Sequence, residues 1–313
     1  MEVLVTGGAG FIAHHLAAAL IRRGDKVTLV DNFNDYYDPE IKRRNVRDLE
    51  AMGSVKTHAV DILDKAALRR VFEETPPEAI MHLAAWAGVR PSLEKPALYT
   101  DVNVTGTVNL LELAKEFQTG CFIFGSSSSV YGGSDRVPFA EDNPVDRPIS
   151  PYAATKRAGE LLCHTYAHNF GMHITCLRFF TVYGPRQRPD LAIHKFARLM
   201  AEDREIPLFG KGDSRRDYTF VGDIVSGILA AIEKNFPFEI FNLGESQTIS
   251  LMELVSTLED ALGRKARLKW LPEQTGDMKV TYADISKSRR VLGYNPSTPF
   301  REGIRIFADW FQG

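Results

Sequence analysis

Short apolar runs alternate with segments of helical periodicity along the first half of the chain. Five runs have the length and composition of buried strands, at residues 2–6, 26–30, 55–60, 79–82 and 121–125. Apolar residues recur at helical spacing between them, at 11–23, 64–74 and 96–117. Elements that alternate in this way predict an α/β fold with a parallel, doubly wound Rossmann sheet, whose ligand binds at the carboxyl ends of the strands.

The alternation becomes less regular in the second half of the chain. After an expected strand at 173–178, we predict helices at 191–201 and 223–233 and a strand at 239–243. We therefore expect a dinucleotide-binding domain over 1–178, to which 222–243 returns, and a smaller C-terminal substrate-binding lobe formed by 179–221 and 244–313.

A glycine-rich turn, G-G-A-G, follows the first expected strand and opens the first helix. Gly7 and Gly10 let the backbone approach a pyrophosphate there, and the helix N-terminus meets its charge. Asp31 ends the second strand, 21 residues after Gly10, where a carboxylate binds the hydroxyls of an adenosine ribose. Because Asn32 adds no positive charge, these residues predict NAD rather than NADP as the cofactor.

Further residues at strand ends are expected to line the same cofactor site. They are Phe11 and Ile12 after the first strand, Asp61 and Ile62 after the third, Leu83, Ala84 and Ala85 after the fourth, and Ser127, Ser128 and Ser129 after the fifth. Asp61 and Ile62 are expected at the adenine edge, and the small residues leave room beside the nucleotide. One of the serine hydroxyls would complete a relay beside a proton acceptor.

The segment S-P-Y-A-A-T-K, from Ser150, provides a candidate for that acceptor. Pro151 suits a first helical position, so Tyr152 lies in the opening turn of a helix and Lys156 lies on the same face, four residues later. A neighbouring cation and a helix N-terminus both favour an ionised phenol. We therefore expect the pKa of Tyr152 to be lowered toward neutrality.

Composition narrows the class of protein. The chain has 313 residues, 44% of them hydrophobic, and a net charge of −2, so no global field recruits nucleic acid or a membrane surface. Its three cysteines show no metal spacing and have apolar neighbours, which predicts free thiols in a reducing compartment, the cytoplasm. No apolar run is long enough to span a bilayer, and we expect no metal site.

Several motifs taken together resemble the extended short-chain dehydrogenase/reductase family over nearly the whole chain. They are T-G-G-A-G-F-I, V-D-N, H-L-A-A, S-S-S-S-V-Y-G, Y-A-A-T-K and R-F-F-T-V-Y-G-P. Within that family the chain is most similar to the nucleotide-sugar epimerases that act on UDP-glucuronate. The closer similarity lies in N-F-N-D-Y-Y-D, A-G-V-R and T-V-Y-G-P-R-Q-R-P-D-L.

The resemblance implies a reaction, an NAD cofactor and a UDP-sugar substrate. By family position, Tyr152 takes the proton of the sugar 4-hydroxyl, Lys156 holds the nicotinamide ribose, and Ser127 is the catalytic serine, with Ser128 as its alternative. Hydride leaves carbon 4 for NAD and returns to the other face of the rotated 4-keto sugar. The resemblance also implies a cofactor contact for Asn103 and a homodimer formed through two long helices.

Substrate contacts are implied mainly for the second half of the chain. The residues are Arg90, Thr181, Arg186, Arg188, Lys195, Leu208, Phe209, Arg216 and Asp277, together with Ser127, Ser128 and Ser129. Thr181 and Arg188 are the candidates for a uronate carboxylate, with Arg186 as a rival. The chain departs from the family at Trp86, Gln274 and Thr275, where glutamine, arginine and proline are usual.

Alternative functions stay open at this point. The same residues suit epimerisation of UDP-glucose or a UDP-N-acetylhexosamine, or a net sugar-nucleotide dehydrogenase or decarboxylase. The related dehydratases and decarboxylases carry T-D-E or T-S-E before V-Y-G, whereas this chain has Ser128 and Ser129. The basic run at 42–47 is expected to be a solvated helix face, and His14 and His15 are expected to have no partners.

Overall fold

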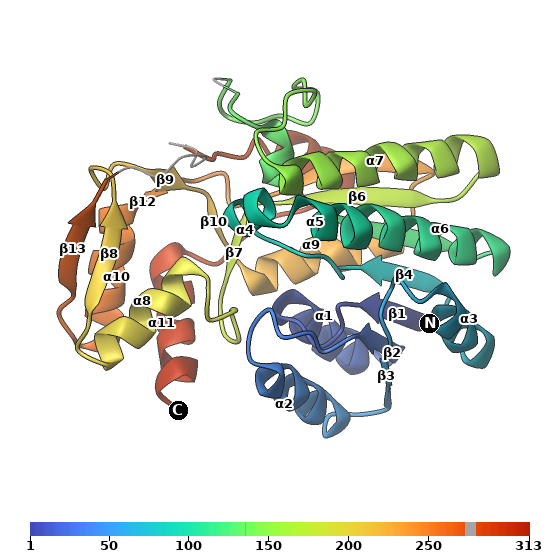
Figure 1. Cartoon of the computed structure of the whole chain (residues 1–313), viewed down its shortest axis with the longest axis horizontal. Coiled ribbons are helices and arrows are strands. Elements are labelled where there is room, and N and C mark those ends of the chain that lie inside the picture. The colour runs from blue at the N-terminus through green and yellow to red at the C-terminus, as the bar shows by residue number, and fades with distance from the viewer. Residues whose placement is uncertain (135, 273–279) are drawn as a thin grey trace.

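The computed structural model describes residues 1–134, 136–272 and 280–313. It has two lobes, a large one around a parallel sheet and a smaller one containing β8, β13, α8, α10 and α11 (Figure 1). Asp277, Gln274 and Thr275 lie outside the described residues. No helix of the described part is long and apolar enough to cross a membrane.

Seven parallel strands form the main sheet, in the order β11-β6-β5-β4-β1-β2-β3. Their bounds are β1 Glu2–Thr6, β2 Lys26–Asp31, β3 Val55–Ala59, β4 Ala79–His82, β5 Cys121–Ser127, β6 Ile174–Phe179 and β11 Phe238–Leu243. The strand order reverses next to β1, which is where doubly wound sheets bind their ligands. The predicted α/β fold is confirmed.

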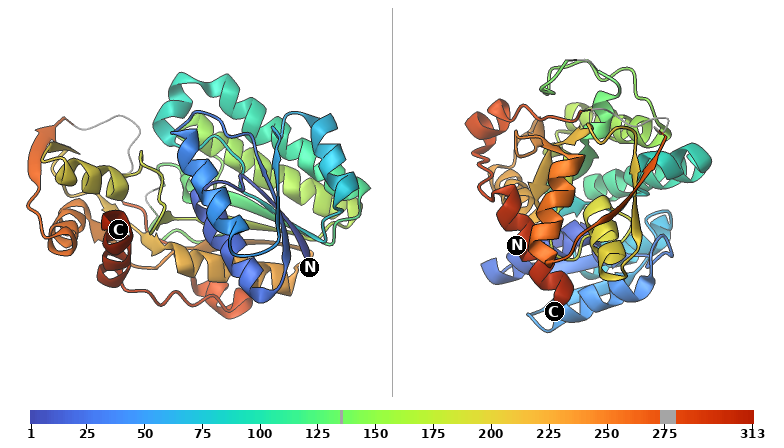
Figure 2. Two further views of the ribbon diagram at one scale, coloured as in Figure 1. Left: turned by 90° about the horizontal axis from the view of Figure 1, so that it is seen from below. Right: turned by 90° about the vertical axis from the view of Figure 1, so that its left-hand side faces the viewer.

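Helices cover both faces of this sheet. Alternate residues of β1 point to opposite faces, so Val3 and Val5 pack against α1, α2 and α9, whereas Leu4 packs against α3, α6 and α7. The helices are α1 Phe11–Arg23, α2 Pro39–Glu50, α3 Lys65–Glu74, α4 Val89–Glu94, α5 Pro96–Thr100, α6 Gly106–Glu116, α7 Pro151–Phe170 and α9 Val221–Lys234. Figure 2 shows these two layers from below and from the end.

Two local differences from the sequence prediction have structural causes. The long helix expected at 96–117 is divided into α5, a π-helical turn at Asp101–Thr105, and α6. The turn brings the amide of Asn103 against the backbone of Trp86. The helix α4 was not predicted, because its apolar positions are few, and of α2 only the basic run at 42–47 was expected to be helical.

The smaller lobe has a separate core. Its elements are β7 Thr181–Tyr183, α8 Ala192–Ala201, β8 Glu205–Phe209, β9 Arg215–Arg216, β10 Tyr218–Phe220, β12 Ile249–Ser250, α10 Leu251–Leu262, β13 Arg267–Leu271 and α11 Phe300–Gln312. Short two-stranded sheets join β7 to β10, β8 to β13 and β9 to β12. Apolar residues of α8, α10 and α11 pack together around them.

Candidate active site

A cavity of about 510 Å³ lies at the carboxyl ends of β1, β2, β4, β5 and β6. The predicted residues that line it are Gly7, Gly10, Phe11, Ile12, Asp31, Asn32, Asp61, Ile62, Leu83, Ala84, Ala85, Ser127, Ser128, Ser129, Tyr152, Lys156, Thr181 and Arg188. The strand ends and the start of α7 therefore contribute to one site. The size of the cavity suits an extended ligand.

One end of the cavity, the glycine end, is defined by Gly7, Gly10, Asp31, Lys42 and Ala84. Gly7 has a φ of +66°, and a Cβ built on it would lie 2.9 Å from the backbone nitrogen of Ala84. Gly10 caps α1 without any side-chain hydrogen bond. The backbone at the start of α1 is therefore open to an anion, which fits the pyrophosphate of a dinucleotide.

Asp31 and Lys42 form the deep part of the glycine end. The Asp31 carboxylate accepts hydrogen bonds from the backbone of Ala9 at 3.2 Å and Phe33 at 2.8 Å. Lys42 Nζ lies 4.0 Å from this carboxylate and donates to the backbone oxygen of Asn34 at 2.9 Å. The expectation of a solvated face at 42–47 is thus wrong for Lys42, which is 5% exposed. Its long methylene chain is buried while its ammonium group finds oxygen partners.

Tyr152 and Lys156 lie in the first two turns of α7. The side chain of Ser150 caps this helix by accepting from the backbone nitrogen of Ala153 at 3.1 Å. Lys156 Nζ donates to the backbone oxygen of Gly125 at 2.7 Å. Burial lowers the pKa of Lys156 to about 8. This buried ammonium group therefore titrates close to physiological pH.

The expected lowering of the Tyr152 pKa is not what the structure gives. Burial raises this pKa, and a hydrogen bond with Ser127 and the charge of Arg188 only partly oppose the effect. A phenol deprived of water resists ionisation, and the Lys156 ammonium points to a carbonyl instead. Ser127 is the serine that contacts Tyr152, and its hydroxyl donates to that of Ser129 at 3.1 Å.

A second part of the cavity wall, the arginine end, is defined by Tyr36, Trp86, Thr181 and Arg188. The Arg188 guanidinium donates two hydrogen bonds to Asp190, at 3.0 and 2.8 Å, and stacks 5.1 Å above the Tyr36 ring. Burial opposes the charge of Arg188, but the hydrogen bonds to Asp190 raise its pKa. The edge of Trp86 meets Tyr36 at 5.1 Å between ring centroids. The tryptophan therefore forms a wall of the cavity.

Arg186 points away from the cavity and ties its loop to the large lobe. It donates to Asn45 Oδ1 at 2.9 Å and to Asp48 at 2.6 Å, both on α2. His15 on α1 bonds the backbone oxygen of Pro185 at 2.8 Å, so the expectation that it has no partner is wrong. His14 likewise bonds the backbone oxygen of Asn45. The loop that carries Arg188 is thus held by α1 and α2.

The other predicted residues do not line the cavity. Asn103 is buried and holds the backbone of Trp86 through both atoms of its amide. Arg90 lies 5.4 Å from the Phe209 ring, which brings α4 against β8. Leu208 is fully buried in the core of the smaller lobe. The rest are Lys195 on α8 and Arg216 on β9, whose Nη1 donates to the backbone oxygen of Arg215.

Sequence reasoning missed several residues that line the cavity. Four of them lie close together in the chain, Asn34, Tyr36, Tyr37 and Lys42. All lie in the loop after β2 or at the start of α2, where periodicity is weak, and N-F-N-D-Y-Y-D gave the only signal. Within the described ranges, no group of three metal-ligating side chains is present.

Comparisons with known proteins agree with this geometry. The family model for the NAD dependent epimerase/dehydratase family matches residues 3–244. A UDP-glucuronate 4-epimerase from Thermodesulfobacterium geofontis is 43% identical over 308 residues, which cover 98% of this chain and 95% of the relative. The resemblance seen in the sequence motifs is therefore confirmed.

Solved structures extend the comparison to the fold. The UDP-glucuronic acid 4-epimerase from Bacillus cereus, in complex with UDP-glucuronic acid and NAD, is 38% identical with a TM-score of 0.93, and the match covers 100% of this chain and 99% of that one. The UDP-glucose 4-epimerase from Thermus thermophilus, in complex with NAD, is 32% identical with a TM-score of 0.91. This match also covers 100% of this chain and 99% of that one. Because both proteins share the backbone, side chains have to determine which sugar is accepted.

Proposed function

The chain belongs to the NAD dependent epimerase/dehydratase family, and we propose that it inverts carbon 4 of UDP-glucuronate, giving UDP-galacturonate through a 4-keto sugar. NAD is its cofactor, because the glycine end has the cradle and the ribose carboxylate that a dinucleotide requires. Bound there, NAD would serve as the acceptor and donor of the hydride of carbon 4.

Proton transfer is assigned to Tyr152. Its phenolate accepts the proton of the sugar 4-hydroxyl and gives it back after the ring has turned, while Ser127 steadies the phenol oxygen by the hydrogen bond between them. Because burial opposes ionisation of this phenol, a nearby positive charge has to assist it. Arg188 supplies one such charge, and a bound oxidised nicotinamide would add another.

Arg188 is the observation that favours a uronate over a neutral hexose. Its guanidinium lines the cavity and lies near enough to Tyr152 to affect the pKa of the phenol. A carboxylate on carbon 5 needs a cation or several donors near the reacting carbon, and Arg188 and Thr181 offer both. Arg188 is preferred to Arg186 because it lines the cavity, whereas Arg186 donates to Asn45 and Asp48 on α2.

Net decarboxylation or dehydration fits the site less well. These reactions need an acid or base beside the reacting carbon in addition to the tyrosine. Ser128 and Ser129 occupy the corresponding positions and carry hydroxyl groups only. Reversible inversion is therefore the reaction that these side chains can complete.

Other features belong to the same proposal. The large lobe, with 222–243, binds NAD, and 179–221 with 244–313 binds the uridine diphosphate. We expect a cytoplasmic protein, because its buried free cysteines suit a reducing compartment. We also expect a homodimer, because α7 exposes Leu161 and Phe170, which a second copy would cover.

A product analysis tests this function. The holoenzyme is incubated separately with UDP-glucuronate and UDP-glucose, and the products are resolved by chromatography, with Tyr152→Phe as the inactive control. UDP-galacturonate should form without net NADH. Accumulated NADH or a pentose product would indicate a dehydrogenase or decarboxylase. Faster conversion of UDP-glucose than of UDP-glucuronate would instead indicate the neutral-sugar epimerase.

A further inference from the structure

Three consecutive residues of β5 each contact a different side chain of α7. The first and third of them bind Lys156 and Tyr152, as described above. Ser126 lies between them, and its hydroxyl donates to Glu160 Oε1 at 2.7 Å. Glu160 follows Lys156 by one helical turn, so both side chains lie on the same face of α7. The reaction assigned above uses Tyr152 and Lys156 but not Ser126 or Glu160.

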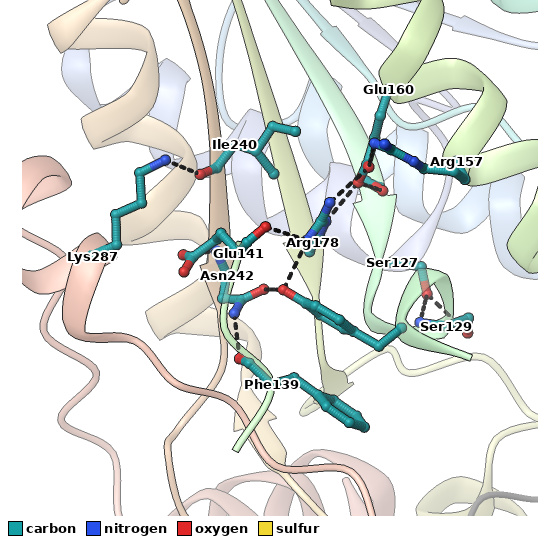
Figure 3. A network of polar contacts seen from close by, with 12 residues as sticks. Ser127, Ser129, Phe139, Glu141, Arg157, Glu160, Arg178, Ile240, Asn242 and Lys287 are labelled. Carbon is teal, nitrogen blue, oxygen red and sulfur yellow. Dashed lines mark hydrogen bonds and ion pairs between the residues drawn. The ribbon is translucent and has the colours of Figure 1, made fainter. Parts of the chain in front are cut away.

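A buried ion pair holds Glu160 in place. Arg178 on β6 donates to both carboxylate oxygens of Glu160, at 2.8 and 2.9 Å, and each residue is 1% exposed (Figure 3). The Arg178 guanidinium also stacks 4.8 Å from the Tyr131 ring and donates to its hydroxyl at 2.9 Å. Arg157 reaches Glu160 from the partly exposed side at 3.0 Å.

Stability alone is a poor explanation for this pair. Removing two charges from water costs about as much as their attraction returns, so apolar residues of the same volume often stabilise a fold equally well. A buried, fully hydrogen-bonded ion pair instead restricts the elements that carry it to a single arrangement. Here that geometry connects α7 to β5 and β6 at the level of the catalytic side chains.

We propose that Ser126, Glu160 and Arg178 form a clamp that positions α7 on β5 and keeps Lys156 charged. The clamp acts through Lys156 and Tyr152, so its members are positioning residues; Glu160 and Arg178 are buried and do not line the cavity, whereas Ser126 also borders it. Fixing the rotation of α7 brings the Tyr152 hydroxyl to Ser127. The Glu160 carboxylate also supplies a negative charge one helical turn from the Lys156 ammonium.

Two groups on α7, Cys163 and Glu160, favour the charged form of Lys156. Burial lowers the pKa of Lys156 to about 8, while Cys163 and Glu160 on the same helix raise it. His82 on β4 also faces Lys156, but burial lowers the pKa of this histidine to about 3, so it is neutral. From β5 the contacts are the Gly125 carbonyl and the Phe124 ring, neither of which titrates. Arg178, on β6, faces the far side of Glu160.

The variant Glu160→Gln tests both parts of the proposal, which rests on the proposed function for its kinetic readout. We expect kcat to fall about tenfold or more, since small displacements of catalytic groups are costly. The KM for UDP-glucuronate should stay within about twofold, as is usual when binding contacts are kept. The alkaline limb of the pH–rate profile should move to lower pH by about one unit, because Lys156 loses a negative neighbour.

Two further variants separate positioning from general stability. Arg157→Gln removes the partly exposed partner of Glu160 and leaves Ser126 and Arg178 in place, so kcat and the alkaline limb should stay nearly unchanged. Ser126→Ala keeps the ion pair but removes its tie to β5. This variant should fold and should lose about threefold to tenfold in kcat, in line with an active-site hydrogen bond of ordinary strength.

The pH dependence of NAD binding provides a readout that needs no epimerisation. The full-length protein should show weaker NAD binding as Lys156 loses its proton, and the midpoint should move to lower pH in Glu160→Gln but not in Arg157→Gln. A wild-type protein that binds NAD in this way but forms no UDP-galacturonate would refute the proposed function and not the clamp. Unchanged midpoints and pH–rate profiles in Glu160→Gln, or an unchanged kcat in Ser126→Ala, would overturn the clamp. If Glu160→Gln fails to fold, the kcat of Ser126→Ala decides whether the clamp exists.

Discussion

The glycine end and the arginine end of the cavity are built from different parts of the chain. At the glycine end, backbone groups and small residues such as Gly7 and Ala84 form the surface, and β1, β2 and β4 fix them within one sheet. At the arginine end, long side chains from separate loops come together, among them Tyr36, Trp86 and Arg188. The first arrangement suits a ligand common to a whole family, whereas the second can change with single substitutions.

The largest expected effect lies where the two ends meet. Tyr152→Phe should lower kcat by about 10²–10⁴-fold, because only the proton acceptor is lost. The affinity for NAD should change little, since the glycine end is untouched. Steady-state kinetics and an NAD titration measure the two quantities. Tyr166→Phe, on the same helix but bonded to Glu112, is the matched control and should stay active. A Tyr152→Phe enzyme with most of its turnover would assign the proton to another group.

Arg188→Ala should weaken the recognition of UDP-glucuronate at the arginine end of the cavity. A charge-assisted hydrogen bond is worth roughly 1.5–3 kcal/mol, so kcat/KM for UDP-glucuronate should fall by about 10–150-fold. UDP-glucose should be affected much less, because it has no carboxylate. Parallel kinetics with the two sugars measure this difference. Equal losses for both sugars would mean that Arg188 supports the cavity and does not choose the substrate.

The glycine end should select NAD by charge. The wild-type protein should bind NAD at least about tenfold more tightly than NADP, because Asp31 repels a 2′-phosphate. Asp31→Asn leaves Lys42 without its carboxylate at 4.0 Å, so the preference for NAD should shrink or reverse. Lys42→Met should not reverse it. Direct titrations of both dinucleotides measure these affinities, and wild-type binding of NADP as tight as that of NAD would contradict the assignment.

The last effect concerns stability and not catalysis, and it lies in the support beneath the glycine end. His82 bonds Thr6 at 2.7 Å and Thr107 at 3.0 Å, and burial, followed by the charge of Lys156, lowers its pKa to about 3. The unfolded chain therefore binds one more proton than the folded chain between about pH 6.5 and pH 3. The free energy of unfolding should fall with decreasing pH by up to about 1.4 kcal/mol per unit in this window.

Urea unfolding between pH 4 and pH 7 measures that slope. His82→Gln removes the titrating group and keeps hydrogen-bonding capacity, so its stability should depend less steeply on pH. The buried carboxylate Asp217 acts in the opposite direction, because burial raises its pKa to about 6. It is present in both proteins and cancels in the comparison. Identical slopes for the two proteins would show that His82 does not carry the effect.

The contrast between the two ends also explains what could be predicted from the sequence. Gly7, Gly10, Asp31, Tyr152 and Lys156 have functions that depend on backbone conformation and short spacing, so the sequence alone predicted their place in the cavity. Lys42 and Tyr36 face the cavity only because of the path taken by the loop after β2.

Arg186 and Arg188 show the limit of such prediction. The two arginines are neighbours in a loop, and no periodicity distinguishes the one that turns inward. The distinction depends on Asn45 and Asp48, which are more than a hundred residues away in the chain. The pKa of Tyr152 could not be predicted either, because the burial that raises it results from the complete fold.

The anchoring of the Arg188 loop affects how fast the proposed epimerisation can proceed. Arg186 and His15 fasten this loop to α2 and α1, and Asp190 and Tyr36 hold the guanidinium itself. Arg188 therefore cannot follow a sugar that turns over between the two hydride transfers. In the proposed reaction, the carboxylate therefore has to leave this arginine when the ring turns. The affinity of Arg188 for the carboxylate and the rate at which the sugar rotates are then in competition. Tighter binding of the uronate would slow epimerisation.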